Sequence, residues 1–191
     1  SDSAGPNQSI RGLTAALSDE FSFRRVSRDR PFGAVATTTP SDRWIEGGGE
    51  LIRYCTPSIQ GKKQLFRILK YTSYDILMLT SFFDREYTIP ALLLRRLGLI
   101  PRRPTIVSPR GEFSPGALKL KALRKCAYIR FARATGLYND VVMHATGDQE
   151  LRDIRNAFPW AADYAVAGNV SQVPKYEDRL FCHSAGPIRL A

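Results

Sequence analysis

The sequence has few of the residues that build metal sites, disulfide frameworks or membrane spans. Three cysteines and two histidines occur in 191 residues, and no two of them stand at the spacing of metal ligands. No apolar run approaches the roughly 18 residues of a membrane-spanning helix. The first six residues lack the basic head and apolar core of a signal peptide. We therefore expect a cytoplasmic protein in a reducing setting, without a bound metal.

Two glycine-rich nucleotide-binding loops are missing as well. The Gly-x-Gly-x-x-Gly loop does not occur, so dinucleotide binding has little support. The Gly-x-x-x-x-Gly-Lys-Ser/Thr loop is absent too, which excludes a P-loop NTPase. The remaining composition, with 43% hydrophobic and 24% charged residues, is that of a globular domain rather than of a disordered chain.

The net charge of +10 is concentrated in one third of the sequence. Residues 87–139 contain 11 basic residues and one acid, Glu112, whereas the rest of the chain has 17 residues of each sign. A field of this kind attracts phosphate groups, anionic membrane surfaces or nucleic acid, although a basic face kept for solubility explains it equally simply. Nucleic acid is not the expected partner, because no recognition motif occurs and aromatic residues are not interleaved with the basic ones.

Apolar residues alternate along the chain between helical and strand periodicity. The pattern predicts helices at 6–21, 62–71, 87–97, 115–136 and 146–157. It predicts strands at 21–27, 44–46, 50–56, 75–80, 105–107, 141–145 and 162–167, with a glycine turn at 47–49. This alternation indicates an α/β fold with a Rossmann-like, mostly parallel sheet and helices on both faces.

The domain is expected to span residues 1–170. Rossmann-like domains open with a strand that leads into the first glycine loop, but here that loop stands at the start of the sequence, so we expect the first strand to be missing. Residues 171–191 are interpreted as a polar linker and the start of a missing C-terminal domain.

Ligands of open parallel sheets bind at the carboxyl ends of the strands, so the residues that follow each strand are candidates. Arg110 could pair with a phosphate or carboxylate, and Gly111 would let a ligand approach the backbone. His144 is a candidate base or donor to a sugar hydroxyl, and Glu150 lies in the first turns of the next helix. Gly5 precedes a helix N-terminus, where N–H groups favour phosphate. Four of these residues have a structural alternative. Arg110 could be a surface arginine, His144 a packed histidine, Glu150 a capping acid and Gly5 a turn glycine.

These segments occur in an order that resembles a known family. Asp-Ile-Leu-Met-Leu-Thr-Ser-Phe-Phe at 75–83 is followed by Ser-Pro-Arg-Gly at 108–111, Ser-Pro-Gly-Ala-Leu at 114–118, and His-Ala-Thr at 144–146 with Glu150. This combination resembles the N-terminal domain of family 4 glycosyltransferases, which have the GT-B fold. The resemblance covers nearly the whole chain and is strongest from 74 to 154. Ala4 in place of a glycine and Gly147 in place of a serine depart from the pattern.

The resemblance implies one half of an enzyme that transfers a sugar from a nucleotide-diphosphate sugar to a glycan or lipid-linked acceptor. Such enzymes usually retain the anomeric configuration and usually need neither metal nor cofactor. The missing C-terminal domain would hold most of the donor, so the chain alone is expected to be inactive. Carried over by position, Arg110 and His144 would be catalytic, and Gly5, Gly111 and Glu150 would bind the donor.

A second interpretation is a non-catalytic Rossmann-like module that docks on an anionic membrane, at its inner face, or on a protein partner. The helix predicted at 115–136 supplies the cations that would contact lipid, namely Lys119, Lys121, Arg124 and Lys125. Its apolar residues, however, form two stripes on nearly opposite sides. That pattern favours a helix covered on both sides over one that lies in a bilayer surface.

Overall fold

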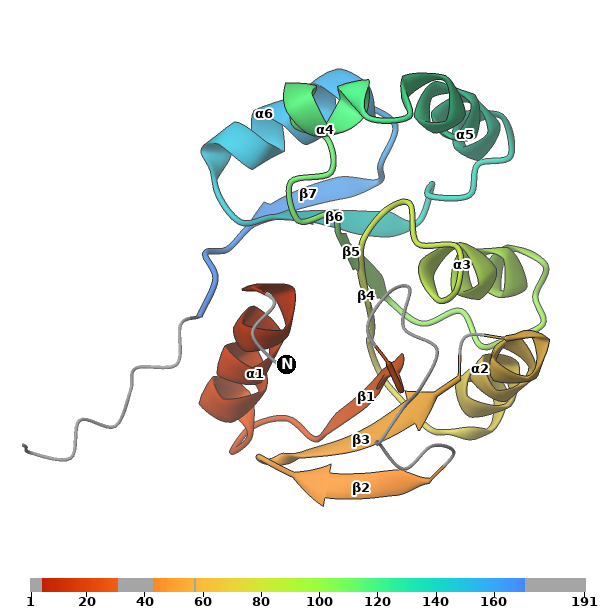
Figure 1. Cartoon of the computed structure of the whole chain (residues 1–191), viewed down its shortest axis with the longest axis vertical. Coiled ribbons are helices and arrows are strands. Elements are labelled where there is room, and N and C mark those ends of the chain that lie inside the picture. Colours follow the sequence, from red (N-terminus) through yellow and green to blue (C-terminus); the bar gives the residue numbers. More distant parts are fainter. Residues whose placement is uncertain (1–4, 31–42, 57, 171–191) are drawn as a thin grey trace, which may run out of the picture.

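The strands of the computed structural model, which describes residues 5–30, 43–56 and 58–170, form two sheets (Figure 1). The first has the order β1–β3–β2, with β1 at Phe23–Arg28, β2 at Trp44–Gly47 and β3 at Glu50–Cys55. The second has the order β4–β5–β6–β7, at Leu77–Thr80, Thr105–Ser108, Val141–Ala145 and Asp163–Val166. The helices are α1 (Gly5–Leu17), α2 (Ile59–Tyr71), α3 (Thr88–Arg96), α4 (Pro115–Lys119), α5 (Ala122–Ala134) and α6 (Asp148–Ala157).

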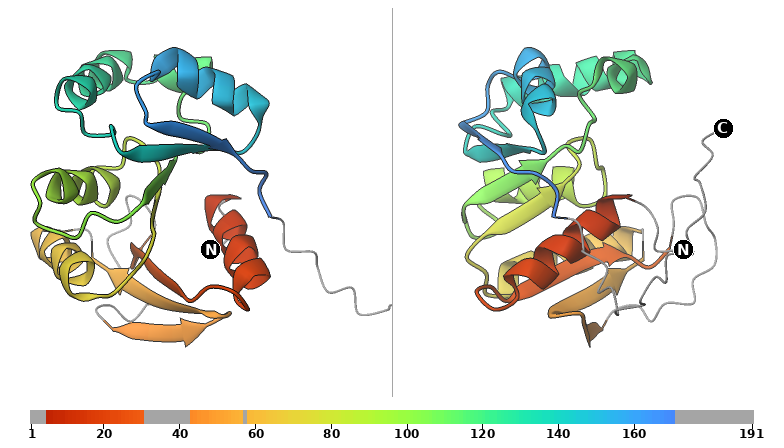
Figure 2. Two further views of the ribbon diagram at one scale, coloured as in Figure 1. Left: turned by 180° about the vertical axis from the view of Figure 1, so that it is seen from behind. Right: turned by 90° about the vertical axis from the view of Figure 1, so that its left-hand side faces the viewer.

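The β4–β7 sheet is parallel throughout, as the alternation of strands and helices predicts. Because its strands follow one another in sequence order, right-handed crossovers place α3, α4–α5 and α6 on one face. α2 lies on this side too, whereas α1 lies on the opposite side (Figures 1 and 2). The chain is therefore an α/β domain that is Rossmann-like in its β4–β7 part.

The expectation of one mostly parallel sheet is only partly confirmed, because the β1–β3–β2 sheet is separate and mixed. β1 pairs with β3 in parallel, and β2 pairs with β3 in antiparallel orientation. The predicted glycine turn joins β2 to β3. Gly48 and Gly49 have φ angles of 64° and 78°, which a two-residue hairpin of this kind requires at both central positions.

Side chains connect β1 to β4 at both ends of these edge strands. At their amino ends, the Arg24 guanidinium donates to the Ser73 carbonyl oxygen over 2.9 Å. At their carboxyl ends, Arg28 pairs with Asp84 at 3.3 Å. The carboxyl ends of both sheets therefore face the same edge of the domain, which is the edge where the sequence predicts the site.

Most predicted elements are found within three residues of their expected bounds. α2 begins after Ser58, whose Oγ accepts the Gly61 N–H at 3.1 Å. α3 ends just before Gly98, whose φ of 71° is the left-handed conformation expected after a helix. α1 stops at Leu17, four residues earlier than predicted. The expected linker at 171–191 lies outside the described residues.

The single helix predicted at 115–136 is wrong, because the chain forms two helices there. Ser114 caps α4 as predicted, with its Oγ accepting the Ala117 N–H at 3.3 Å. Lys121 then adopts a left-handed φ of 57° and separates α4 from α5. The Lys125 ammonium donates to the Ala117 carbonyl oxygen over 2.7 Å, which ties the two helices together across this break.

The apolar residues of α4 and α5 are not covered on both sides, contrary to expectation. Leu120 and Leu123 are 70% and 88% exposed, and Phe131 is 46% exposed. Ala132, on the other side of α5, is only 1% exposed and packs in the core. No helix within the described ranges is both long and apolar enough to cross a membrane.

Aromatic rings fill the core beneath the carboxyl ends of β4 and β5. Phe82 is fully buried and stacks on Tyr138 with ring centroids 4.3 Å apart. Phe113 and Phe158 meet the Phe82 ring edge-on at 4.8 and 5.1 Å. The Tyr138 hydroxyl donates to the Phe82 carbonyl oxygen at 2.9 Å, and burial raises the pKa of Tyr138 far above its ordinary value, so it remains a donor. This core fixes the loop that follows β4.

Candidate functional site

The carboxyl ends of β5 and β6 and the start of α6 bring four of the five predicted site residues to one edge of the sheet, where a hydrogen bond joins two of them, Gly111 and Glu150, directly. Arg110 and Gly111 follow β5, His144 lies near the end of β6, and Glu150 lies in the first turn of α6. Open parallel sheets bind ligands at this edge. The fifth residue, Gly5, begins α1 on the other side of the sheets.

The position of Gly5 follows from the short connection between α1 and β1. A turn of five residues, 18–22, joins them, so α1 runs back along β1 and its N-terminal end lies toward the carboxyl end of that strand (Figure 2). Gly5 therefore lies at the same edge of the domain as the group around Arg110. The partial positive charge of a helix N-terminus is thus directed toward this edge.

The Glu150 carboxylate joins the loop after β5 to the start of α6. One oxygen accepts the Gly111 N–H at 2.6 Å, and the other accepts the N–H and the hydroxyl of Thr146 at 2.8 and 2.6 Å. Burial alone would raise the pKa of Glu150, but these hydrogen bonds outweigh burial and hold the pKa below its ordinary value. Glu150 is therefore an ionised carboxylate that fixes the position of Gly111.

Both ring nitrogens of His144 are engaged by the chain itself. Nε2 lies 3.0 Å from the Ala167 carbonyl oxygen, which can only accept, so Nε2 carries a proton. In the neutral ring, Nδ1 then accepts the Ser108 hydroxyl at 2.9 Å. His144 thus links β5 to the segment that leaves β7.

Arg110 has the least satisfied side chain of the group. Its φ of 56° is unusual for a residue other than glycine, and such conformations concentrate at functional sites. Its Nη1 donates to the Asn169 side-chain oxygen, but its Nε is buried and has no partner in the described part of the chain. Burial lowers the pKa of Arg110 and the nearby Glu150 charge partly offsets this, so the guanidinium stays cationic.

Glu112 is a further member of this edge, although no motif in the sequence singles it out. Its carboxylate accepts the Ser81 hydroxyl at 2.6 Å and the Phe82 N–H at 2.5 Å. Ser81 itself has a left-handed φ of 79°. Glu112 therefore connects the turn after β4 to the loop after β5. Its position as the single acid among 11 basic residues was a signal that could have identified it.

The arrangement is suited to binding an anion rather than to holding a metal ion. Arg110 supplies a guanidinium with an unpaired N–H at the strand ends, and such a fork pairs with phosphate or carboxylate. Across the described ranges, no group of three or more His, Cys, Asp or Glu side chains lies close enough to bind a metal.

Comparison with protein-family models, with curated proteins and with solved structures gives no match for this chain.

Proposed function

We propose that the chain is the acceptor-side half of a nucleotide-sugar-dependent glycosyltransferase of the GT-B type, which transfers a sugar with retention to a glycan or lipid-linked acceptor. The observation that carries the proposal is the Arg110 side chain. Its buried, unpaired Nε lies at the carboxyl edge of a parallel sheet on a left-handed backbone. A cation placed there would stabilise the phosphate charge of a sugar donor or of a lipid-linked acceptor.

The other residues of the site receive roles from their contacts. Glu150 holds Gly111 in place, and His144 holds the segment after β7 in place. We therefore propose both as positioning residues. Gly111 leaves space for a ligand, because nothing lies within 4 Å of the Cβ that a larger residue would place there. The α1 N-terminus at Gly5 would face the donor diphosphate.

In the transfer step, the bond between the anomeric carbon and the donor phosphate oxygen breaks, and a bond to the acceptor oxygen forms. The electron pair of the broken bond leaves with the nucleoside diphosphate, which also takes up the acceptor proton. Arg110 and the α1 N-terminus would stabilise the negative charge that develops on this leaving group.

Replacing Arg110 by alanine in the intact protein that contains this chain is expected to lower kcat/KM for sugar transfer at least about 100-fold, because a donor to developing charge is lost. Turnover would be measured with a panel of nucleotide sugars and with glycan and lipid-linked acceptors. Arg102→Ala is the matched control, since Arg102 is exposed and precedes β5 at the opposite end of the same strand. Unchanged turnover in the Arg110 variant, or an equal loss in the Arg102 variant, would contradict the proposal.

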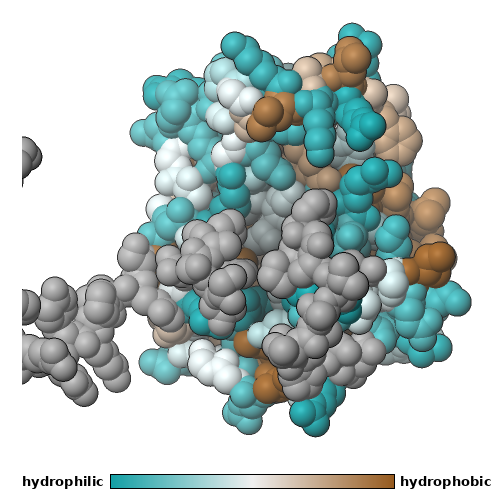
Figure 3. Space-filling view, in the orientation of Figure 1, coloured by the Kyte–Doolittle hydropathy of each residue, from teal (hydrophilic) through white to brown (hydrophobic). Residues whose placement is uncertain are grey.

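A second candidate function, docking on an anionic membrane, is favoured by the surface of α4 and α5. Leu120 and Leu123 are largely exposed, and three exposed cations, Lys119, Lys121 and Arg124, lie beside them. No acidic residue occurs between 113 and 139. Figure 3 shows apolar groups in brown among hydrophilic groups in teal at the end of the molecule that α4 and α5 occupy. Apolar side chains ringed by cations are typical of interfacial helices.

Lys125 does not belong to this surface, although its place in the sequence beside the other three cations predicts that it does. Its ammonium donates to the Ala117 carbonyl oxygen and lies 4.9 Å from the centre of the Phe83 ring. It is only partly exposed. A variant that tests membrane binding should therefore leave Lys125 intact, because its replacement would disturb the junction between α4 and α5.

The triple variant Lys119→Gln, Lys121→Gln, Arg124→Gln is expected to lose at least about tenfold in binding to vesicles with 30% phosphatidylglycerol, because each cation near an anionic surface contributes about 1 kcal/mol. Co-sedimentation would compare these vesicles with pure phosphatidylcholine. The control removes three charges from α2, as Lys62→Gln, Lys63→Gln, Arg67→Gln. Equal losses in both variants would show an effect of net charge alone, and absence of binding by the unmodified chain would dismiss this function.

A further inference from the structure

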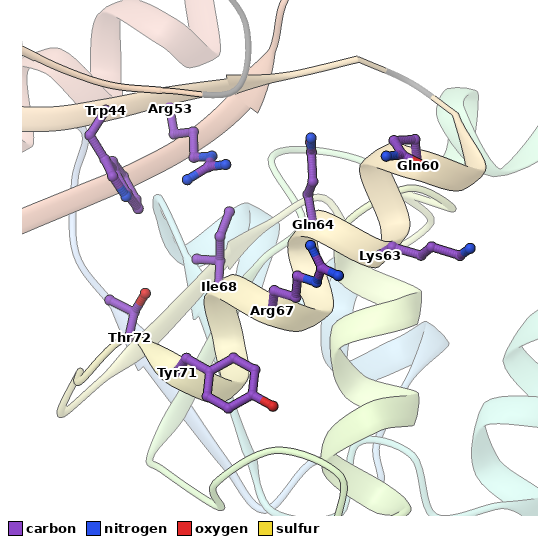
Figure 4. A pocket seen from close by; sticks show the side chains of 9 residues that line it. All are labelled: Trp44, Arg53, Gln60, Lys63, Gln64, Arg67, Ile68, Tyr71 and Thr72. Carbon is purple, nitrogen blue, oxygen red and sulfur yellow. The ribbon is translucent and has the colours of Figure 1, made fainter.

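A polar pocket lies away from the strand ends, between the β2–β3 hairpin and α2 (Figure 4). Its volume is about 450 Å³, within the range of small-ligand sites. The residues that matter for its chemistry are Trp44, Arg53, Lys63, Gln64, Arg67 and Tyr71.

The geometry of the pocket follows from strand pairing. Trp44 and Arg53 stand directly opposite each other in the antiparallel pair of β2 and β3, so their side chains share one face. Figure 4 shows both extending toward α2, while Gln64 and Ile68 extend from α2 toward the strands. The indole, the guanidinium and the amide therefore converge from two elements on the same space.

The lining of the pocket is cationic. Arg53, Lys63 and Arg67 contribute three positive charges, and none of the residues that line the pocket is acidic. Arg53 Nε and Gln64 Oε1 are buried, and neither has a hydrogen-bond partner in the described ranges. A buried polar atom without a partner is costly, so these two atoms indicate a ligand that supplies one acceptor and one donor.

Arg53 differs from the arginines of the neighbouring strand β1. Arg25 pairs with Glu50 at 2.7 Å, and Arg28 pairs with Asp84 at 3.3 Å. Arg53 has no carboxylate partner within the described residues, and its guanidinium only approaches the Trp44 ring, 6.0 Å from the ring centre. Two of the three arginines of β1 are thus paired with carboxylates, whereas the guanidinium of the pocket has no such partner within the described residues.

We propose that this pocket binds a phosphorylated sugar. The phosphate pairs with the Arg53 guanidinium, with Lys63 and Arg67 adding positive charge at the rim. The apolar face of the sugar ring packs on Trp44, and a ring hydroxyl donates to Gln64 Oε1. This site is separate from the group around Arg110, and the proposal does not depend on the transferase function.

The test uses glucose 6-phosphate as the probe and Trp44 fluorescence as the readout. The chain has two tryptophans, so a Trp160→Phe background leaves Trp44 as the only one. Glucose 6-phosphate is expected to change the fluorescence and to bind at least tenfold more tightly than glucose or inorganic phosphate, because it engages both Arg53 and Gln64. Arg53→Gln is expected to weaken its binding at least tenfold, whereas Lys62→Gln, on α2 but outside the lining, is expected to leave it unchanged.

Three outcomes would overturn the proposal. Inorganic phosphate or sulfate could bind as tightly as glucose 6-phosphate, which would show a general anion site. Binding could persist in Arg53→Gln, or it could be lost in Arg110→Ala, which would place the phosphate at the strand ends. Circular dichroism would confirm that Arg53→Gln folds. If it does not, Gln64→Ala replaces it, and this variant should bind glucose 6-phosphate no better than inorganic phosphate.

Discussion

Replacing Phe82 by alanine is expected to lower the free energy of unfolding by about 3–5 kcal/mol, the range found for buried aromatic residues. The ring is fully buried, and five aromatic rings lie within 5.6 Å of its centre, those of Phe83, Phe113, Tyr128, Tyr138 and Phe158. Its removal would leave a cavity that this many rigid neighbours cannot fill. Urea unfolding of the variant and the unmodified chain, extrapolated to water, measures the difference.

Two further variants make the Phe82 result specific. Phe82→Leu keeps most of the buried volume and should cost about 1–2 kcal/mol. Phe21→Ala removes the same side chain at a position that is 49% exposed and should cost about 1 kcal/mol or less. A loss below about 1.5 kcal/mol for Phe82→Ala would show that the aromatic cluster is loosely packed and does not fix the loop after β4.

Replacing Glu150 by glutamine is expected to lower the free energy of unfolding by about 2–3 kcal/mol at neutral pH, because hydrogen bonds to a charged group are lost. The glutamine amide keeps one acceptor oxygen, but its NH₂ group can only donate. It would therefore face a donor, either the Gly111 N–H or the N–H and hydroxyl of Thr146, that a carboxylate oxygen accepts in the unmodified chain. The sequence-predicted role of Glu150 in ligand binding stays a prediction. This experiment tests its structural role.

The same substitution should change how stability depends on pH. The folded pKa of Glu150 is held below its ordinary value of 4.5, so its stabilising effect is present above that value and is lost as the pH falls through the folded pKa. The glutamine variant should lack this loss on the acid side. Asp148→Asn is the control, since Asp148 is an exposed acid in the same first turn of α6. Parallel pH profiles of the Glu150 variant and the unmodified chain would refute this account.

The positions of the strands were largely predictable, because short apolar runs in the sequence mark the segments that are buried as strands. The runs around Val107 and Met143 lie in β5 and β6, and both residues are fully buried. The division into two sheets was not predictable, because periodicity reports which residues are buried but not which strands pair. Arg24 and Arg28, whose side chains connect β1 to β4, have no pattern that indicates their partners.

The site was predictable in position but not in detail. The rule that ligands bind at strand carboxyl ends selected Arg110, His144 and Glu150, and these residues do meet. The hydrogen bonds of Glu150 to Gly111, of His144 to Ser108 and of Arg110 to Asn169 join residues far apart in sequence and leave no local signal. The break at Lys121 was missed for a related reason. No glycine or proline marks the break, because the residue in the left-handed conformation is a lysine. The conformational energy of that lysine is offset by the hydrogen bond from Lys125 to Ala117, which the sequence does not reveal.

The separation of the two sheets has a consequence for how the domain opens. Cooperative units of unfolding follow continuous backbone ladders, and in the described part of the chain no such ladder crosses from β1 to β4. The bridging contacts include the ion pairs of Arg28 with Asp84 and Glu86 and the hydrogen bond of Arg24 to Ser73. They are exposed or partly exposed, and ion pairs of this kind contribute about 1 kcal/mol or less each. We therefore expect the β1–β3–β2 sheet to unfold while β4–β7 stays intact. Amide protons of β3 would then exchange with solvent through a subglobal opening, independently of those in β5 and β6.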